Sequence, residues 1–212
     1  MDKTRLEAFS DGVIAVAITL LVIDLHVPEP ADDVSLAHQL AEQWPSFAAY
    51  VVSFLTIGVI WVNHHATFRR LRSVDRSILL LNIVLLLTVV LLPFTTALMA
   101  RYLLEDSGRS LAAAIYGGSL MLMSAVFLTL NWHLLSRRAH LLHEDVTPEY
   151  RRTVLRRNLI GVAPYALATV GALITPYLTL AISGAVAIYF MLPVATPEMP
   201  ATDDSGRASR AD

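Results

Sequence analysis

The chain contains no cysteine and few charged residues for its length. The absence of cysteine from its 212 residues excludes disulfides, thiol catalysis and cysteine-ligated metals. Only 16% of the residues are charged, against about 25% in a soluble domain of average composition, whereas 55% are apolar. The formal net charge of −2, with no dense run of Lys and Arg, argues against a nucleic-acid partner. The composition predicts a membrane protein of one domain.

Motifs for catalysis are also missing. The sequence has no Gly-rich phosphate loop and no serine-nucleophile elbow. His64 and His65 make a poor metal site, because adjacent helical residues point about 100° apart. The spacing of His140, His143 and Glu144 resembles that of metal ligands, but it falls in a polar loop and lacks a zincin arrangement. We therefore expect no enzyme activity, no cofactor and no metal site.

Six apolar segments predict six transmembrane helices, since each span takes about 20 helical residues. The last two are short and separated only by Thr175-Pro176, which favours a tight hairpin. We expect the first to be a retained helix and not a secretory signal, because Asp11 interrupts its start and no small-x-small site follows before the acidic stretch at 29–33. The expected fold class is all-α and polytopic, with a six-helix transmembrane unit at 1–195 and a disordered cytoplasmic tail at 196–212. The segments are 6–27, 45–65, 78–100, 111–133, 159–175 and 177–194.

The basic residues alternate between the connecting loops. With the N-terminus inside, fourteen of the sixteen Lys and Arg residues fall on the cytoplasmic side, and only Arg101 and Arg109 fall outside. Both termini are therefore expected in the cytoplasm. A short amphipathic helix is expected at 35–43, and Thr147-Pro148 predicts the start of a basic helix that continues into the fifth span. Leu85 in the third span is expected to face lipid.

Polar side chains gather where the predicted helices meet the cytoplasm. Polar residues inside a membrane are costly and often mark function. We expect Asp11 to face the bundle interior and to take its partners from this layer and from Arg5. The alternative is that the layer only anchors helix ends at the membrane surface. Its members include Ser10, Asp11, His64, His65 and Asn82.

Helical spacing divides the first span into two faces. If the face of Asp11 points inward, the face of Val16 points out of the subunit, toward lipid or toward a symmetry axis. The apolar composition of that face favours lipid. Val16 shares its face with Gly12, Thr19, Leu20, Ile23 and Val27, and Asp11 shares the opposite face with Ala15, Ile18 and Val22.

The start of the first span resembles the transmembrane-protein-175 potassium channels, whose signature is Arg-x-x-x-Phe-Ser-Asp. The segment Trp61-Val-Asn-His64-His65 and the pair Pro93-Phe94 are also similar to that family, as is the six-helix layout. The resemblance thus covers nearly the whole membrane region. All four signature positions are present, as Arg5, Phe9, Ser10 and Asp11.

The resemblance implies a channel for potassium and other monovalent cations, with the first helix lining the pore. It implies apolar constriction rings at Val16, Leu20 and Ile23 and a selectivity threonine at Thr19. A single six-helix unit implies a prokaryotic homotetramer, surrounded by lipid in the plasma membrane. The chain has no Thr-Val-Gly-Tyr-Gly filter, so an apolar ring would gate by dewetting. Asp24 at the outer mouth is expected to concentrate cations.

Two other functions stay open at this point. Asp11 and the histidines could relay protons, either alone or alongside potassium. Alternatively, the polar layer only holds helices together in a non-conducting scaffold. A small-solute transporter is disfavoured, because the chain contains no internal repeat or pair of broken helices.

Overall fold

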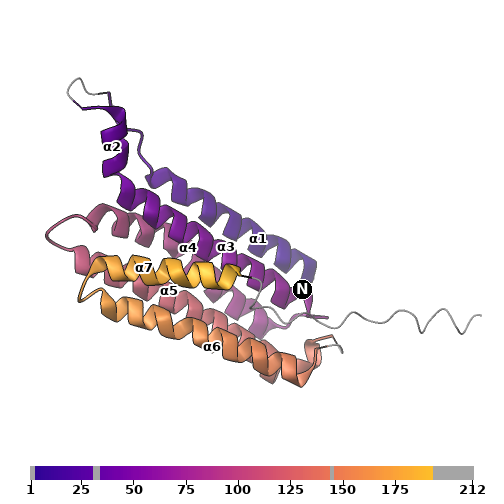
Figure 1. The fold of residues 1–212 in the computed structure, drawn as a ribbon. Coiled ribbons are helices and arrows are strands. Elements are labelled where there is room, and N and C mark those ends of the chain that lie inside the picture. The colour runs from indigo at the N-terminus through magenta and orange to yellow at the C-terminus, as the bar shows by residue number, and fades with distance from the viewer. Residues whose placement is uncertain (1–2, 31–33, 144–145, 193–212) are drawn as a thin grey trace, which may run out of the picture.

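The computed structural model describes residues 3–30, 34–143 and 146–192, and its long helices run side by side in one bundle (Figure 1). The short helix α2 projects from one end of that bundle. The predicted tail at 196–212 and the end of the sixth predicted span lie outside the described residues. The helices are α1 (Lys3–Leu20), α2 (Leu36–Glu42), α3 (Trp44–Arg69), α4 (Arg76–Tyr102), α5 (Arg109–Trp132), α6 (Pro148–Gly171) and α7 (Pro176–Met191).

Within the residues that the structure describes, four helical segments are long and apolar enough to cross a membrane. They correspond to the first four predicted spans, and they are Lys3–Asp24, Trp44–Arg69, Arg76–Tyr102 and Arg109–Arg137. Helix α6 has a basic N-terminal half, and α7 has only 16 residues. At 1.5 Å per residue α7 measures about 24 Å, less than the roughly 30 Å of a hydrocarbon core. The predicted hairpin between them is confirmed, because α6 ends at Gly171, α7 begins at Pro176 and the two helices pack together.

Side-chain caps start three of these helices. Ser35 Oγ accepts a hydrogen bond from His38 N, which begins the predicted short helix. Thr147 Oγ1 accepts one from Tyr150 N, so the predicted start of the basic helix is confirmed. Asp75 caps α4 in the same manner. These caps satisfy backbone N–H groups that have no partner within the helix.

The start of α1 and two of the interhelical connections meet at one end of the bundle, here called the basic end. Lys3 Nζ donates to Arg69 O at 3.4 Å. Arg72 N donates to Leu141 O at 2.8 Å, and the connection between α5 and α6 returns a bond to Arg70 O at 2.9 Å. The α3–α4 and α5–α6 connections therefore lie side by side, as the alternation of charge in the sequence requires.

The core lies among α3, α4 and α5. Ser53 Oγ on α3 forms hydrogen bonds with Thr96 Oγ1 of α4 at 2.7 Å and with the Tyr116 hydroxyl of α5 at 3.0 Å. Leu85 is fully buried, so its predicted exposure to lipid is wrong. The exposed large hydrophobic side chains of α4 lie on another face, which includes Leu80, Leu87 and Phe94.

Helix α1 lies at one edge of the bundle (Figure 1). It packs mainly on α3 and α4, while α6 and α7 pack at the other side of the core. One side of α1 is therefore covered by the subunit, and the other side is left open. This placement decides which of its residues are available to lipid or to further subunits.

Candidate pore helix and its polar anchor

The buried face of α1 repeats at helical spacing. It consists of Leu6, Ser10, Ile14 and Ala17, and it continues to Leu21 in the 3₁₀ turn η1 (Leu21–Asp24). These positions recur every three or four residues, so they form one stripe against α3 and α4. Ser10 is the polar member of this stripe and is completely buried.

The open face of α1 carries the residues predicted for the constriction. Val16 is 58% exposed, Leu20 38% and Ile23 68%. Gly12 and Thr19 are also exposed. The predicted outward direction of this stripe is therefore confirmed for the single subunit.

The opposite face differs from the prediction. Asp11 is only half-buried, and Ala15 and Val22 are exposed. Ser10, the residue before Asp11, is the polar side chain of α1 that lies deepest in the bundle. The expectation that Asp11 faces the interior is therefore wrong, and the interior position is one residue earlier. A turn of about 100° per residue moves Asp11 from the centre of the packed face to its margin.

A buried hydrogen-bonded chain joins α1, α4 and α3. Ser10 Oγ donates to Leu6 O at 2.9 Å, so it accepts from Asn82 Nδ2 at 2.9 Å. Asn82 Oδ1 then accepts from His64 Nε2 at 2.8 Å. The His64 ring is almost fully buried and stacks on Phe68 at 4.2 Å between ring centroids. This chain fixes both the Asn82 amide orientation and the His64 tautomer.

Asp11 takes part in a second, more exposed contact. Trp61 Nε1 on α3 donates to Asp11 Oδ1 at 2.9 Å, and the Trp61 ring stacks with His65 at 6.2 Å. Arg5 and Phe9 are both exposed. Within the described chain the partner of Asp11 is thus Trp61, whereas sequence reasoning assigned it to Arg5 and the layer of amides and histidines.

Trp61 is the site residue whose role sequence reasoning missed. It lies three positions before His64 on α3, so the two side chains lie near one another on the helix surface. The spacing between Trp61 and His64, together with the N–H donor of the Trp61 indole, could have identified Trp61 from the sequence. The anchor of α1 therefore has an inner contact through Ser10 and a peripheral contact through Asp11.

The hydroxyl of Thr19 donates to the backbone carbonyl of Val16 at 2.9 Å. Its oxygen lone pairs therefore stay available on the open face of α1, where they could accept a cation. The helix tightens into η1 directly afterwards.

The region predicted to be the outer mouth carries charges of both signs. Asp24 at the end of η1 lines an open cavity together with His26 and with Arg101 at the end of α4. A cation that approaches Asp24 through this cavity also meets the guanidinium of Arg101. The role of Asp24 in concentrating cations stays a prediction.

The sequence and fold of this chain are similar to those of known proteins. A sequence profile described as "Endosomal/lysosomal potassium channel TMEM175" matches residues 5–93. A protein of Streptomyces collinus that is named as a potassium channel is 44% identical over 203 residues, which cover 94% of this chain and 98% of that relative. The chain belongs to the TMEM175 family.

Relatives of known structure and from mammals extend this comparison. This chain is similar to the crystal structure of a lysosomal potassium-selective channel TMEM175 homolog from Chamaesiphon minutus, with a TM-score of 0.80 and 34% identity. That alignment covers 92% of this chain and 98% of the other. The human endosomal/lysosomal proton channel TMEM175 is 42% identical over 90 residues, which cover 39% of this chain and 18% of that protein.

Proposed function

We propose that four copies of this chain form a potassium-permeable cation channel in a prokaryotic plasma membrane, with α1 at the central axis. The observation that carries the proposal is the exposed apolar stripe on α1, held at the edge of the bundle by Ser10 and Asn82. The similarity to proteins named as potassium channels supports it. Surrounding lipid and monovalent cations are then the partners of the assembly.

One subunit alone cannot enclose a pore, because its stripe is open on one side. Closed rotational symmetry places the same stripe of each copy on one axis. The rings of Val16, Leu20 and Ile23 would then form a constriction that conducts when it is wetted and closes when it dewets. Thr19 would contribute hydroxyl oxygens between the first ring, Val16, and the second, Leu20. These modest dipoles would favour one cation over another.

We propose six membrane spans per subunit, with both termini in the cytoplasm. The shared location of the α3–α4 and α5–α6 connections at the basic end supports this orientation. Helix α6 enters from the basic end and α7 returns to it, so the short α7 would span with local thinning of the bilayer.

The test of the pore-lining role uses Leu20→Ser and Ile23→Ser in proteoliposomes. Each change places a hydroxyl in the apolar ring, so potassium flux should rise several-fold because the barrier to wetting falls. The matched control is Leu87→Ser on α4, which is 69% exposed but lies on another helix. Flux unchanged in both ring variants would remove α1 from the pore, and light scattering of the purified protein should give the mass of four chains.

Proton passage is the second candidate function, favoured by the closeness of Asp11, Trp61 and His65. The name of the human relative as a proton channel supports it. The variant Asp11→Ala separates the two roles. An anchoring role predicts weaker tetramers, whereas a relay predicts intact tetramers that lose proton flux and keep potassium flux.

A further inference from the structure

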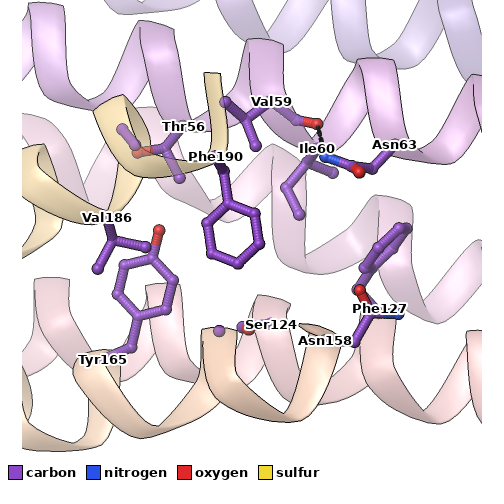
Figure 2. Close-up of a pocket in the computed structure, with 12 residues that line it drawn as sticks. Thr56, Val59, Ile60, Asn63, Ser124, Phe127, Asn158, Tyr165, Val186 and Phe190 are labelled. Atoms are coloured by element: carbon purple, nitrogen blue, oxygen red, sulfur yellow. Dashed lines mark hydrogen bonds between the residues drawn. The ribbon is translucent and has the colours of Figure 1, made fainter. Parts of the chain in front are cut away.

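A cavity lies inside the subunit between α3, α5, α6 and α7, and no described residue of α1 lines it (Figure 2). Its volume is about 40 Å³, whereas one water molecule needs about 10–15 Å³. The cavity therefore has room for a group of a few heavy atoms. All of the described residues that line it are uncharged. Since a charged ligand would lose its hydration among these apolar helices, a guest of this cavity should be neutral.

The polar groups on the α3 side of the cavity have partners within the protein. Thr56 Oγ1 donates a hydrogen bond to Val52 O at 2.7 Å, and Asn63 Nδ2 donates one to Val59 O at 2.7 Å. The hydroxyl group of Tyr165 on α6 in turn interacts with Thr56. The protein itself therefore satisfies these donors.

Asn158 on α6 is the exception. Its Nδ2 atom is buried and has no hydrogen-bond acceptor among the described residues. Buried donors are nearly always paired in folded proteins, and an unpaired one indicates an unseen partner. Because Asn158 lines the cavity, the guest should carry a hydrogen-bond acceptor. The oxygen atom of a hydroxyl group meets this requirement without a charge.

The ring of Phe190 on α7 is part of the wall between the cavity and the surface of the bundle. Figure 2 shows this ring pointing into the cavity, between Tyr165 and Asn158. The ring rests on Gly161 of α6, where an added Cβ atom would lie 3.0 Å from Phe190 Cζ. Phe190 also lines an open apolar groove on the surface, which includes Ile18 of α1. A rotation of this one side chain would therefore join the cavity to the groove.

We propose that this cavity binds a small neutral alcohol. The hydroxyl oxygen accepts a hydrogen bond from Asn158 Nδ2, and the carbon chain lies against Phe190 and the other apolar walls. Ligand sites of this kind are mostly apolar, with a few polar groups that fix the orientation of the ligand. The alcohol enters from the apolar groove when the Phe190 ring turns outward. Binding takes place within one subunit and does not depend on ion conduction.

The experiment photolabels the purified full chain in an uncharged detergent with a diazirine derivative of butanol. Mass spectrometry of the digested protein then locates the adducts. An excess of n-butanol identifies the saturable part of the labelling. We expect saturable adducts on residues that line the cavity, among them Tyr165 and Phe190.

A matched pair of variants on α7 tests the cavity itself. Ala187 is buried and lines the cavity, whereas Ala185 is exposed on the same helix. Ala187→Leu fills the space and should remove the saturable labelling, and Ala185→Leu should leave it unchanged. If Ala187→Leu does not fold, Ala187→Val takes its place, with a weaker but still measurable loss of labelling.

A comparison of two competitors tests the hydroxyl contact. Asn158→Leu keeps a similar volume and removes the donor. In this variant n-butanol should displace the label only at a concentration about three- to tenfold higher, since one neutral hydrogen bond is lost. The competitor n-pentane carries a methyl group in place of the hydroxyl group. The concentration of n-pentane that displaces the label should therefore not rise in Asn158→Leu.

Saturable labelling that persists when Ala187 is enlarged, or that is absent from the unchanged protein, would overturn the site. Displacement by n-butanol that is unchanged in Asn158→Leu would overturn the assigned contact with Asn158. An equal rise for n-butanol and n-pentane would overturn it as well, because the loss would then not involve the hydroxyl group.

Discussion

The buried chain from Ser10 through Asn82 to His64 makes a specific prediction about stability. Replacing Asn82 with Leu keeps a similar volume but removes the amide that bridges α1 and α3. His64 Nε2 then loses the acceptor that lies at 2.8 Å, and Ser10 Oγ loses the donor at 2.9 Å. Since all three side chains are almost fully buried, water does not replace these partners.

The magnitude follows from the groups left without partners. Hydrogen bonds between membrane helices contribute about 0.6 kcal/mol on average and up to about 1.7 kcal/mol. A buried donor without a partner costs about 1–3 kcal/mol. We therefore expect Asn82→Leu to lower the free energy of unfolding by about 1–3 kcal/mol. Adding His64→Phe removes the orphaned N–H and keeps an aromatic ring against Phe68, so the double variant should be less destabilised than the sum of the single variants.

The assay is a double-mutant cycle on reversible unfolding in mixed micelles, followed by helical circular dichroism. A coupling energy of at least about 0.5 kcal/mol is expected for residues in direct contact. The matched control pairs Asn82→Leu with Thr129→Ala, since Thr129 is exposed on α5 and bonds only its own helix. If the effects of Asn82→Leu and His64→Phe add as closely as those of Asn82→Leu and Thr129→Ala, the hydrogen-bonded chain from Ser10 to His64 does not anchor α1.

Four further outcomes are expected. In this cysteine-free chain, a single Cys at Ser107 should react with an impermeant thiol reagent outside intact cells and one at Ala139 should not, whereas the reverse pattern would invert the topology. Thr19→Val should change the potassium-over-sodium preference in flux assays without loss of assembly, because it removes the exposed hydroxyl oxygen. Gly117→Val should lower the melting temperature, because even the Cβ atom of the new side chain would lie 3.1 Å from atoms of α6 and α7, which is closer than ordinary van der Waals contact. Burial alone would raise the pKa of Asp75, but hydrogen bonds and a neighbouring guanidinium lower that pKa to about 2 from its usual 3.8. The ionised Asp75 therefore makes a small contribution to stability above pH 3.8, and this contribution should fade between pH 3.8 and 2. Comparison of the unfolding of the unchanged protein with that of Asp75→Asn over this pH range measures it.

The sequence alone determined the membrane character and the order of the helices. Long apolar runs can be satisfied only by helices in a bilayer, so the first four spans were predicted within a few residues of their bounds. Local chemistry also sufficed at helix starts. The cap at Thr147 and the turn at Thr175-Pro176 depend on residues that are neighbours in the chain, and both were predicted.

The direction of α1 was only partly predictable. Periodicity separated an open stripe containing Val16, Leu20 and Ile23, and that stripe is exposed. It did not identify the centre of the buried face, because the first span is apolar almost all round and a shift of one residue changes its pattern little. The packing of α1 against α3 and α4 decided that Ser10 lies inside and Asp11 at the margin.

Partners across helices were decided only by the tertiary structure. Asn82 lies 72 positions from Ser10, and Trp61 lies 50 positions from Asp11, so no local pattern relates them. Sequence determines which side chains reach the basic end, because that depends on span length and charge. Which of them meet depends on how the helices rotate and pack, and that is settled by the contacts of the whole bundle.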